Sequence, residues 1–327
     1  MGAVVIFAPS PVLTVTIEDL DGEQDIHIHA GGQGVWQARM LHALGASVTL
    51  CGVFSGETGR VARHLLRDEG IQVLSVEGQG SNGAYVHDRR GGERQVLAES
   101  SGHRLTRHEL DELYGLVIQA GIDAGTAILS GPAIEGIVPD DAYRRLASDL
   151  GTAGCTVIAD LAGPRLEAAV SGGVSVMKIA DDELKDSGRA ASEQATDLVD
   201  AMQQLAADGA GTVIVTRAHL PSLLLHEGDV SEIHMPSLES VDTHGAGDSL
   251  TAGVAAALAA GKPIHDAVIL GTAAGALNVT RHGLGTGDAD TIEQLTRLVK
   301  IMPFQGGGAE PAEQSSPDDL ARRLGRK

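Results

Sequence analysis

Aromatic residues and positive charge are both scarce in this sequence. Its 327 residues include three Phe, three Tyr and one Trp, and 24 Lys and Arg stand against 44 Asp and Glu, which gives a formal net charge of −20. A negative field of this size repels nucleic-acid phosphates and anionic lipid, and so few rings argue against a base-stacking surface. We therefore expect neither a nucleic-acid partner nor a membrane partner.

Cysteine and long hydrophobic runs are scarce too. Cys51 and Cys155 lie far apart inside apolar runs, which predicts two reduced core residues rather than a disulfide. The apolar run at the N-terminus stops at Phe7 and has no basic segment before it, so we interpret it as a first strand rather than a signal peptide. The apolar stretch 251–260 is too short to cross a bilayer. These features predict a cytoplasmic protein.

Short β-branched runs alternate with helical patterns along much of the chain. The expected strands are 127–131, 156–160, 174–180 and 212–216, and the expected helices are 140–150, 164–170 and 192–207. This alternation predicts an α/β fold with a doubly wound, mainly parallel sheet flanked by helices. Ligands of such sheets bind beyond the carboxyl ends of the strands, which draws attention to Ser130, Asp160, Lys178 and Thr216.

Other segments alternate apolar and polar residues, which is typical of strands with one face exposed to solvent. They are 13–19, 25–32, 82–89 and 93–100. We expect them to form a small antiparallel β flap, or lid, from about 11–30 and 82–100, over the active edge of the main sheet. The stretch 72–77 fits either sheet. Residues 1–304 would form one large domain, and the Gly-, Pro- and Ser-rich segment 305–327 would form a linker with a short C-terminal helix.

The segment 241–262 is the most informative one. A turn-prone stretch opens a long Ala-rich helix, and Gly245, Ala246 and Gly247 bring backbone N–H groups close to an anion at the positive end of that helix. Asp248 sits in the same turn, where a carboxylate suits the task of accepting a proton from a hydroxyl that attacks a bound phosphoryl group. The alternative is that Asp248 only caps the helix.

Competing motifs do not fit this segment. A dinucleotide fingerprint requires glycine where Leu250 stands, and a P-loop requires Ser or Thr where Pro263 stands. No Gly-x-Ser-x-Gly surrounds Ser249, which argues against a hydrolase.

Two motifs resemble those of the ribokinase-like (PfkB) sugar kinases. DTHGAGDSLTAG is similar to the second family signature, and AGGQGVWQARMLHALGASVTLCGVFSGETGR at 30–60 is similar to the first. The order of motifs over about 1–300 matches as well, and the nearest branch is that of 1-phosphofructokinases and tagatose-6-phosphate kinases. The resemblance implies a ribokinase-like fold and an ATP-dependent, Mg²⁺-dependent kinase acting on a sugar or sugar phosphate.

The resemblance also implies residue roles. Asp248 would be the base, and Gly245, Ala246 and Gly247 would hold the transferring group. Nucleotide contacts would come from Lys178, Thr216, Arg217, His219, Thr243, Gly275 and Asn278. Substrate contacts would come from Ser10, Gly31, Gly32, Gln33, Trp36, Asn82 and Asp248. Glu183 matches the family glutamate that organises Mg²⁺, and Asp160 is either a second acid near the metal or a helix cap.

The sugar side departs from the family pattern. Gln33 stands where the family has a lysine, and Trp36 stands where it has an asparagine. Val12 stands at the position of the substrate-orienting aspartate, and Asn82 at the position of a usual lid arginine. Ala180 and Ala218 replace an asparagine and a glycine on the nucleotide side. We expect an acceptor that is less charged and more apolar than fructose 1-phosphate. Trp36 either stacks on the acceptor or fills the lid interface.

Two further hypotheses stay open at this level. A kinase for a nucleoside or another unphosphorylated acceptor would suit Trp36 and the missing phosphate ligands. A degenerate, non-enzymatic sensor of nucleotide or sugar would suit Val12 and Ala180, whereas the intact Asp248 argues against it. We also expect a homodimer formed through the lid, because exposed strand edges pair between subunits.

Overall fold

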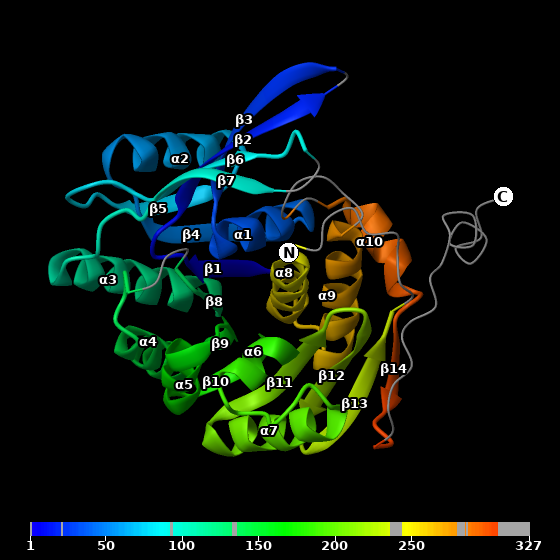
Figure 1. Cartoon of the computed structure of the whole chain (residues 1–327). Coiled ribbons are helices and arrows are strands. Elements are labelled where there is room, and N and C mark those ends of the chain that lie inside the picture. Colours follow the sequence, from blue (N-terminus) through cyan, green and yellow to red (C-terminus); the bar gives the residue numbers. More distant parts are fainter. Residues whose placement is uncertain are drawn as a thin grey trace.

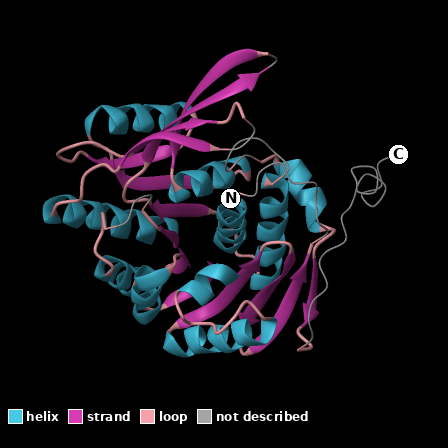
Figure 2. Ribbon diagram, viewed as in Figure 1, coloured by secondary structure: helices cyan, strands magenta, loops and turns pink. Residues whose placement is uncertain are grey.

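The computed structural model describes residues 2–20, 22–91, 94–132, 136–235, 244–279, 285 and 287–306. Within them, the larger sheet has ten strands in the order β14-β13-β12-β11-β10-β9-β8-β1-β4-β5 (Figures 1 and 2). The strands are β1 (Ala3–Phe7), β4 (Ser47–Val53), β5 (Gln72–Val76), β8 (Thr126–Ser130), β9 (Thr156–Asp160), β10 (Val174–Ala180), β11 (Ala210–Arg217), β12 (Leu220–His226), β13 (Asp229–His234) and β14 (Lys300–Pro303).

Neighbouring strands from β5 to β11 run parallel, and β11 to β14 pair antiparallel. The four strands expected at 127–131, 156–160, 174–180 and 212–216 all form. The ambiguous stretch 72–77 becomes β5, at the edge of the main sheet. Strands β12, β13 and β14 were not expected. They pair antiparallel and need no helix between neighbouring strands, so the alternation of strands and helices does not indicate them.

Helices cover both faces of this sheet, as a doubly wound fold requires. One face carries α1 (Gln33–Ala43), α2 (Gly56–Asp68), α8 (Ala246–Ala259), α9 (Ile264–Asn278) and α10 (Ala289–Thr296). The other carries α3 (Arg107–Ala124), α4 (Asp141–Thr152), α5 (Gly163–Gly172) and α7 (Ala195–Asp208), and the short α6 (Asp181–Asp186) follows β10. Alternate residues of β1 serve the two cores: Val5 and Phe7 pack in one, Val4 and Ile6 in the other.

The lid is a separate four-stranded sheet that projects from the main body (Figure 1). Its strands are β2 (Val12–Leu20), β3 (Glu23–Gly31), β6 (Ala84–Asp88) and β7 (Gln95–Ser100). Both expected hairpins form, but β2 and β6 join them in parallel register, so the sheet is mixed rather than wholly antiparallel. The alternation pattern locates strands but carries no information on the direction of pairing between hairpins.

Two further expectations concern the rest of the chain. No helix within the described part is both long enough and apolar enough to cross a membrane. The predicted C-terminal helix and most of the predicted linker lie outside the described residues.

Candidate active site

The first turn of α8 carries the residues that the sequence singled out. Gly245 caps the helix in the left-handed region (φ 76°), a conformation that glycine adopts without strain. The first bond of the helix runs from Ser249 N to Gly245 O, so the amides of Ala246, Gly247 and Asp248 lie outside the helical ladder. They sit at the positive end of the helix dipole, where anions bind.

The carboxyl ends of neighbouring strands bring three further site residues together. Ser130 of β8 is in register with Asp160 of β9, Asp160 with Lys178 of β10, and Ala180 with Thr216 of β11. Lys178 Nζ donates to Asp160 Oδ1 at 3.1 Å, and both side chains are buried. The strand-end argument therefore located a real cluster of polar side chains.

Gln37 of α1 lies in the middle of this cluster, although the sequence analysis did not single it out. Its Nε2 is 3.2 Å from Asp160 Oδ2 and 3.4 Å from Asp248 Oδ1, and its Oε1 accepts from Ser130 Oγ at 2.5 Å. Thr251 Oγ1 also donates to Asp160 Oδ2, at 2.8 Å. The signal was present in the sequence: a polar residue stands at a core position of α1, between Val35 and Ala38.

Two carboxyl groups and one ammonium share this buried site, and their charges act on the pKa values of Asp248 and Lys178. Burial raises the pKa of Asp248 to about 8, and the negative charge of Asp160 adds to the effect. The charge of Lys178 and the hydrogen bonds from Gln33 and Gln37 act in the opposite direction. Burial disfavours the Lys178 ammonium, but Asp160 and Asp248 outweigh it and keep its pKa above the ordinary value.

Gln33 occupies the start of α1, one helical turn before Gln37. Its Oε1 accepts from Gly131 N at 2.7 Å, and its side chain hydrogen-bonds the Asp248 carboxyl. Gln33 therefore contributes a neutral amide that contacts the Asp248 carboxyl. Gly31 and Gly32 lead into this turn, and the Gly32 carbonyl accepts from Val35 N at 3.0 Å.

The residues expected on the nucleotide side lie at the ends of β10 and β11. A register shift between Val215 and Arg217 produces a bulge at Thr216, which is half-buried. Arg217 is buried, with its Nη1 3.4 Å from Pro221 O, and His219 is exposed in the following turn. Glu183 Oε2 accepts from Ala180 N at 3.0 Å, which closes the first turn of α6.

Gly275 and Asn278 of α9 support the anion-binding turn through its main chain. A β-carbon on Gly275 would lie 2.9 Å from Ala246 O, so this glycine allows α9 to pack closely on α8. Asn278 donates to His244 O at 2.8 Å and accepts from Gly285 N at 3.0 Å. Their contact with adenine remains a prediction, and Thr243 lies outside the described residues.

Asn82 anchors loops through its amide. It is buried, its Oδ1 accepts from Ser55 N at 2.6 Å, and its Nδ2 donates to Pro11 O at 2.7 Å and Val53 O at 2.9 Å. These bonds use both amide hydrogens. The substrate contact expected of Asn82 stays a prediction, whereas its structural role follows directly from the bonds.

Trp36 and Ser10 complete the expected substrate side. Ser10 is buried just before the lid strand β2. Trp36 is half-buried, and its indole Nε1 is enclosed without a hydrogen-bond partner in the described part of the chain.

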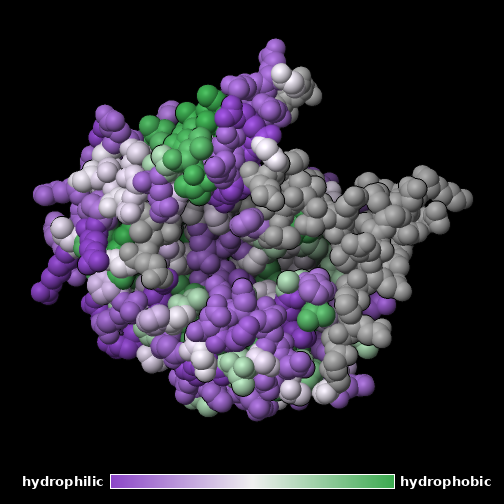
Figure 3. Space-filling view, viewed as in Figure 1, coloured by the Kyte–Doolittle hydropathy of each residue, from purple (hydrophilic) through white to green (hydrophobic). Residues whose placement is uncertain are grey.

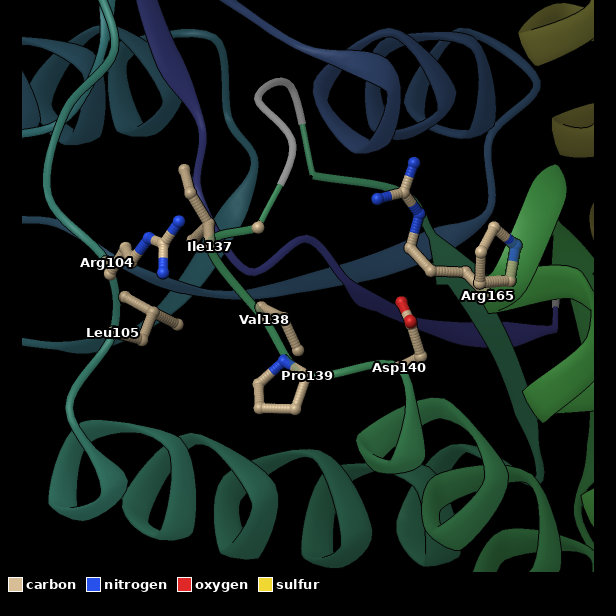
Figure 4. Close-up of a pocket in the computed structure, with 9 residues that line it drawn as sticks. Arg104, Leu105, Ile137, Val138, Pro139, Asp140 and Arg165 are labelled. Carbon is tan, nitrogen blue, oxygen red and sulfur yellow. The ribbon is translucent and has the colours of Figure 1, made fainter.

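A cavity of about 480 Å³ lies between residues 136–140, which precede α4, and the first turn of α5. It is lined by Arg104, Leu105, Gly136, Ile137, Val138, Pro139, Asp140, Pro164 and Arg165. Arg104 and Arg165 approach from opposite sides, and Asp140 lies on the Arg165 side (Figure 4). The sequence analysis named none of these residues as a substrate contact.

Comparison with known proteins identifies the family of this chain. The family model described as pfkB family carbohydrate kinase matches residues 10–292. The 1-phosphofructokinase of Bacillus subtilis (strain 168) is 26% identical over 273 residues, which cover 84% of this chain and 88% of the relative. The ATP-dependent 6-phosphofructokinase isozyme 2 of Escherichia coli (strain K12) is 27% identical over 272 residues, which cover 82% of this chain and 83% of the relative.

Solved structures share the fold. Phosphofructokinase-2 from Escherichia coli in complex with potassium superposes with a TM-score of 0.80 at 24% identity, covering 91% of this chain and 99% of the other. Ribokinase from Arabidopsis thaliana, complexed with ribose and ATP, gives a TM-score of 0.70 at 21% identity, and the match covers 91% of this chain and 99% of the ribokinase. The expected ribokinase-like fold is thereby confirmed.

The chain belongs to the pfkB family of carbohydrate kinases. It is a phosphotransferase whose acceptor is an alcohol group of a sugar, as the two signature motifs predicted.

Proposed function

We propose that this chain transfers the γ-phosphoryl group of ATP to a hydroxyl of its sugar-like acceptor, with Asp248 as the general base. The observation that carries the proposal is a buried carboxylate in the first turn of α8, beside Lys178 and the open amides of that turn. A pKa raised toward neutrality suits a group that must take a proton in one step and release it in the next.

The proposed step balances in atoms and charge. The acceptor oxygen forms a bond to the γ-phosphorus, the bond between that phosphorus and the β–γ bridging oxygen breaks, and ADP leaves. Asp248 Oδ takes the hydroxyl proton as the new bond forms. The amides of Gly245, Ala246 and Gly247 would face the charge on the moving group, and the lid would exclude water.

Of the two acids considered for Mg²⁺, Glu183 fits the metal better than Asp160. Glu183 offers oxygen ligands and uses one oxygen on Ala180 N, which leaves the second for a metal-bound water. Asp160 already receives bonds from Lys178, Thr251 and Gln37, so it would have to release a donor to bind a metal. We propose that Glu183 holds Mg²⁺, which would neutralise phosphate charge, while Asp160 holds Lys178.

The test of the base is Asp248→Asn. Turnover in a coupled ATP assay should fall by about 10³-fold or more, whereas ATP affinity measured by calorimetry should stay within about three-fold of the original chain. Asp266→Asn is the matched control, since Asp266 is an exposed acid in the first turn of the neighbouring helix α9. An active Asp248→Asn variant would refute the proposal.

For the acceptor, we propose that the part held near Gln33 and Trp36 is uncharged. The relatives are named as phosphofructokinases, but Gln33 contributes a neutral amide where the family pattern has a lysine, and Trp36 stands where that pattern has an asparagine. A panel of free sugars, sugar phosphates and nucleosides tests this directly, and rapid turnover of fructose 1-phosphate would contradict it. In that event, Arg104→Ala would show whether the cavity that Arg104 lines binds the phosphate.

We also propose a homodimer formed through the lid. Ile26 and Ile28 of β3 are 61% and 52% exposed and lie on one face, in register with Ile17 and Val15 of β2. An apolar cluster covers the lower part of the lid in Figure 3. Light scattering should give a dimer mass for the original chain and a monomer for Ile26→Glu/Ile28→Glu. Val61→Glu, on exposed α2, should leave the mass unchanged.

A further inference from the structure

We infer that Gln37 is a positioning residue for the general base, and that it holds the Asp248 carboxylate beside Asp160. The inference rests on the proposed role of Asp248 and extends it to a side chain of α1. Gln37 is fully buried, and every polar atom of its side chain faces a group of the site.

The orientation of the Gln37 amide follows from its neighbours. Asp160 pairs with the Lys178 ammonium and only accepts hydrogen bonds, so the NH₂ end of Gln37 must face Asp160, at 3.2 Å. The same nitrogen lies 3.4 Å from Asp248 Oδ1. Ser130 Oγ then donates to Oε1 at 2.5 Å and fixes the opposite end. One side chain thus links α1, β8, β9 and α8 at the point where the acceptor hydroxyl would be deprotonated.

A neutral amide is the group that this position requires. When Asp248 is ionised, it and Asp160 carry two negative charges, and Lys178 carries one positive charge that hydrogen-bonds Asp160. The two N–H groups of Gln37 stabilise both carboxylates without adding a titrating proton. An apolar side chain would leave these carboxylates short of donors, and an acid would add a third negative charge.

Two consequences can be measured. Removal of the Gln37 donor destabilises ionised Asp248, so the pKa of Asp248 should rise further. The charged groups that act on Asp248 are Asp160 of β9 and Lys178 of β10, and neither is altered by the substitution. A looser carboxylate should also slow the chemical step more than it weakens binding, because Gln37 contacts the base rather than the nucleotide turn.

The experiment compares Gln37→Met with Met40→Leu, a buried packing change on the same helix without a polar contact in the site. We expect Gln37→Met to lower kcat by about ten-fold or more, to change either KM by less than about three-fold, and to move the acid limb of the pH profile up by about one unit. Met40→Leu should leave all three unchanged.

Ser130→Ala is the second variant, and it covers the case in which Gln37→Met does not fold. It releases the Oε1 anchor while the NH₂ donor remains, so it should shift the pH profile in the same direction by a smaller amount. Equal losses in kcat and nucleotide affinity, or a pH profile unchanged in both variants, would overturn the inference.

A carboxyl titration separates this inference from the proposed function. In protein with ¹³C-labelled aspartate, the Asp248 resonance is assigned by its loss in Asp248→Asn. Its midpoint should rise in Gln37→Met even if the acceptor panel shows no turnover. An unchanged midpoint contradicts the Gln37 role alone, whereas an active Asp248→Asn variant contradicts the role of the base.

Discussion

A β-carbon on Gly247 would lie 2.5 Å from Nζ of Lys178, so the ammonium of β10 packs directly against the first turn of α8. This contact places a positive charge beside the open amides of that turn and explains why glycine stands there. A side chain at 247 would displace the lysine or the helix.

Gly247→Ala should therefore impair activity with little loss of stability. Displacement of Lys178 should lower kcat/KM by about 100-fold, since a close charged contact contributes about 3 kcal/mol in a dry site. Alanine also favours the helix by about 1 kcal/mol, which offsets part of the strain. Steady-state kinetics and thermal unfolding measure both effects.

Gly115→Ala is the matched control for this change. Gly115 is an exposed helical glycine of α3 with open space around its Cα. The variant should gain about 0.5–1 kcal/mol in unfolding free energy and keep its kcat/KM. If Gly247→Ala behaved in the same way, the proposed role of the Lys178 contact would be wrong.

The raised pKa of Asp248 predicts how stability depends on pH. The folded chain holds the Asp248 proton up to about pH 8, whereas an unfolded aspartate releases it near pH 4. Between these values the folded state binds more protons, so this group makes the unfolding free energy fall as pH rises. Asp248→Asn should make the unfolding free energy less dependent on pH. At pH 8–9 the unfolding free energy of this variant should exceed that of the unsubstituted protein by about 1–2 kcal/mol.

Urea unfolding at several pH values tests this prediction. The two proteins should converge near pH 4, where Asp248 is protonated in both states. A gap that grew toward low pH would show that the folded pKa of Asp248 is depressed instead.

Ala218 should be a strained position. It lies in the turn between β11 and β12 with φ +45°, a region that a residue with a β-carbon adopts at a cost of about 1–2 kcal/mol. Ala218→Gly should raise the unfolding free energy by about 0.5–1 kcal/mol, less than the strain because glycine also gains entropy when unfolded. Ala153→Gly, at φ −75°, should lower it instead.

Asn82 should contribute to stability through its three bonds to main chain. Asn82→Ala leaves buried groups of Ser55, Pro11 and Val53 without their partner, and should cost about 3 kcal/mol or more. Gln79→Ala, at an exposed position nearby, should cost less than about 0.5 kcal/mol. Chemical denaturation measures the difference, and equal costs would contradict the structural role.

The fold was largely predictable because its signals are local. The buried runs at 156–160 and 174–180 are continuous and apolar, as strands covered on both faces must be, and each forms where expected. The antiparallel strands β12 to β14 were missed, because the expected strands were those that alternate with helices. The parallel pairing of β2 with β6 was not indicated, because pairing between distant segments leaves no mark on either segment alone.

For the site, the sequence by itself determined the turn that opens α8, since Gly245, Ala246, Gly247 and Asp248 are contiguous and their open amides follow from the start of the helix. Only the tertiary structure decided what surrounds Asp248. Gln37 lies 211 residues away along the chain, and it reaches the carboxylate because α1 packs beside α8 over the ends of the strands. The physical reason is that main-chain geometry is encoded by neighbouring residues, whereas the ionisation of a buried group is set by whichever distant side chains the fold brings into contact with it.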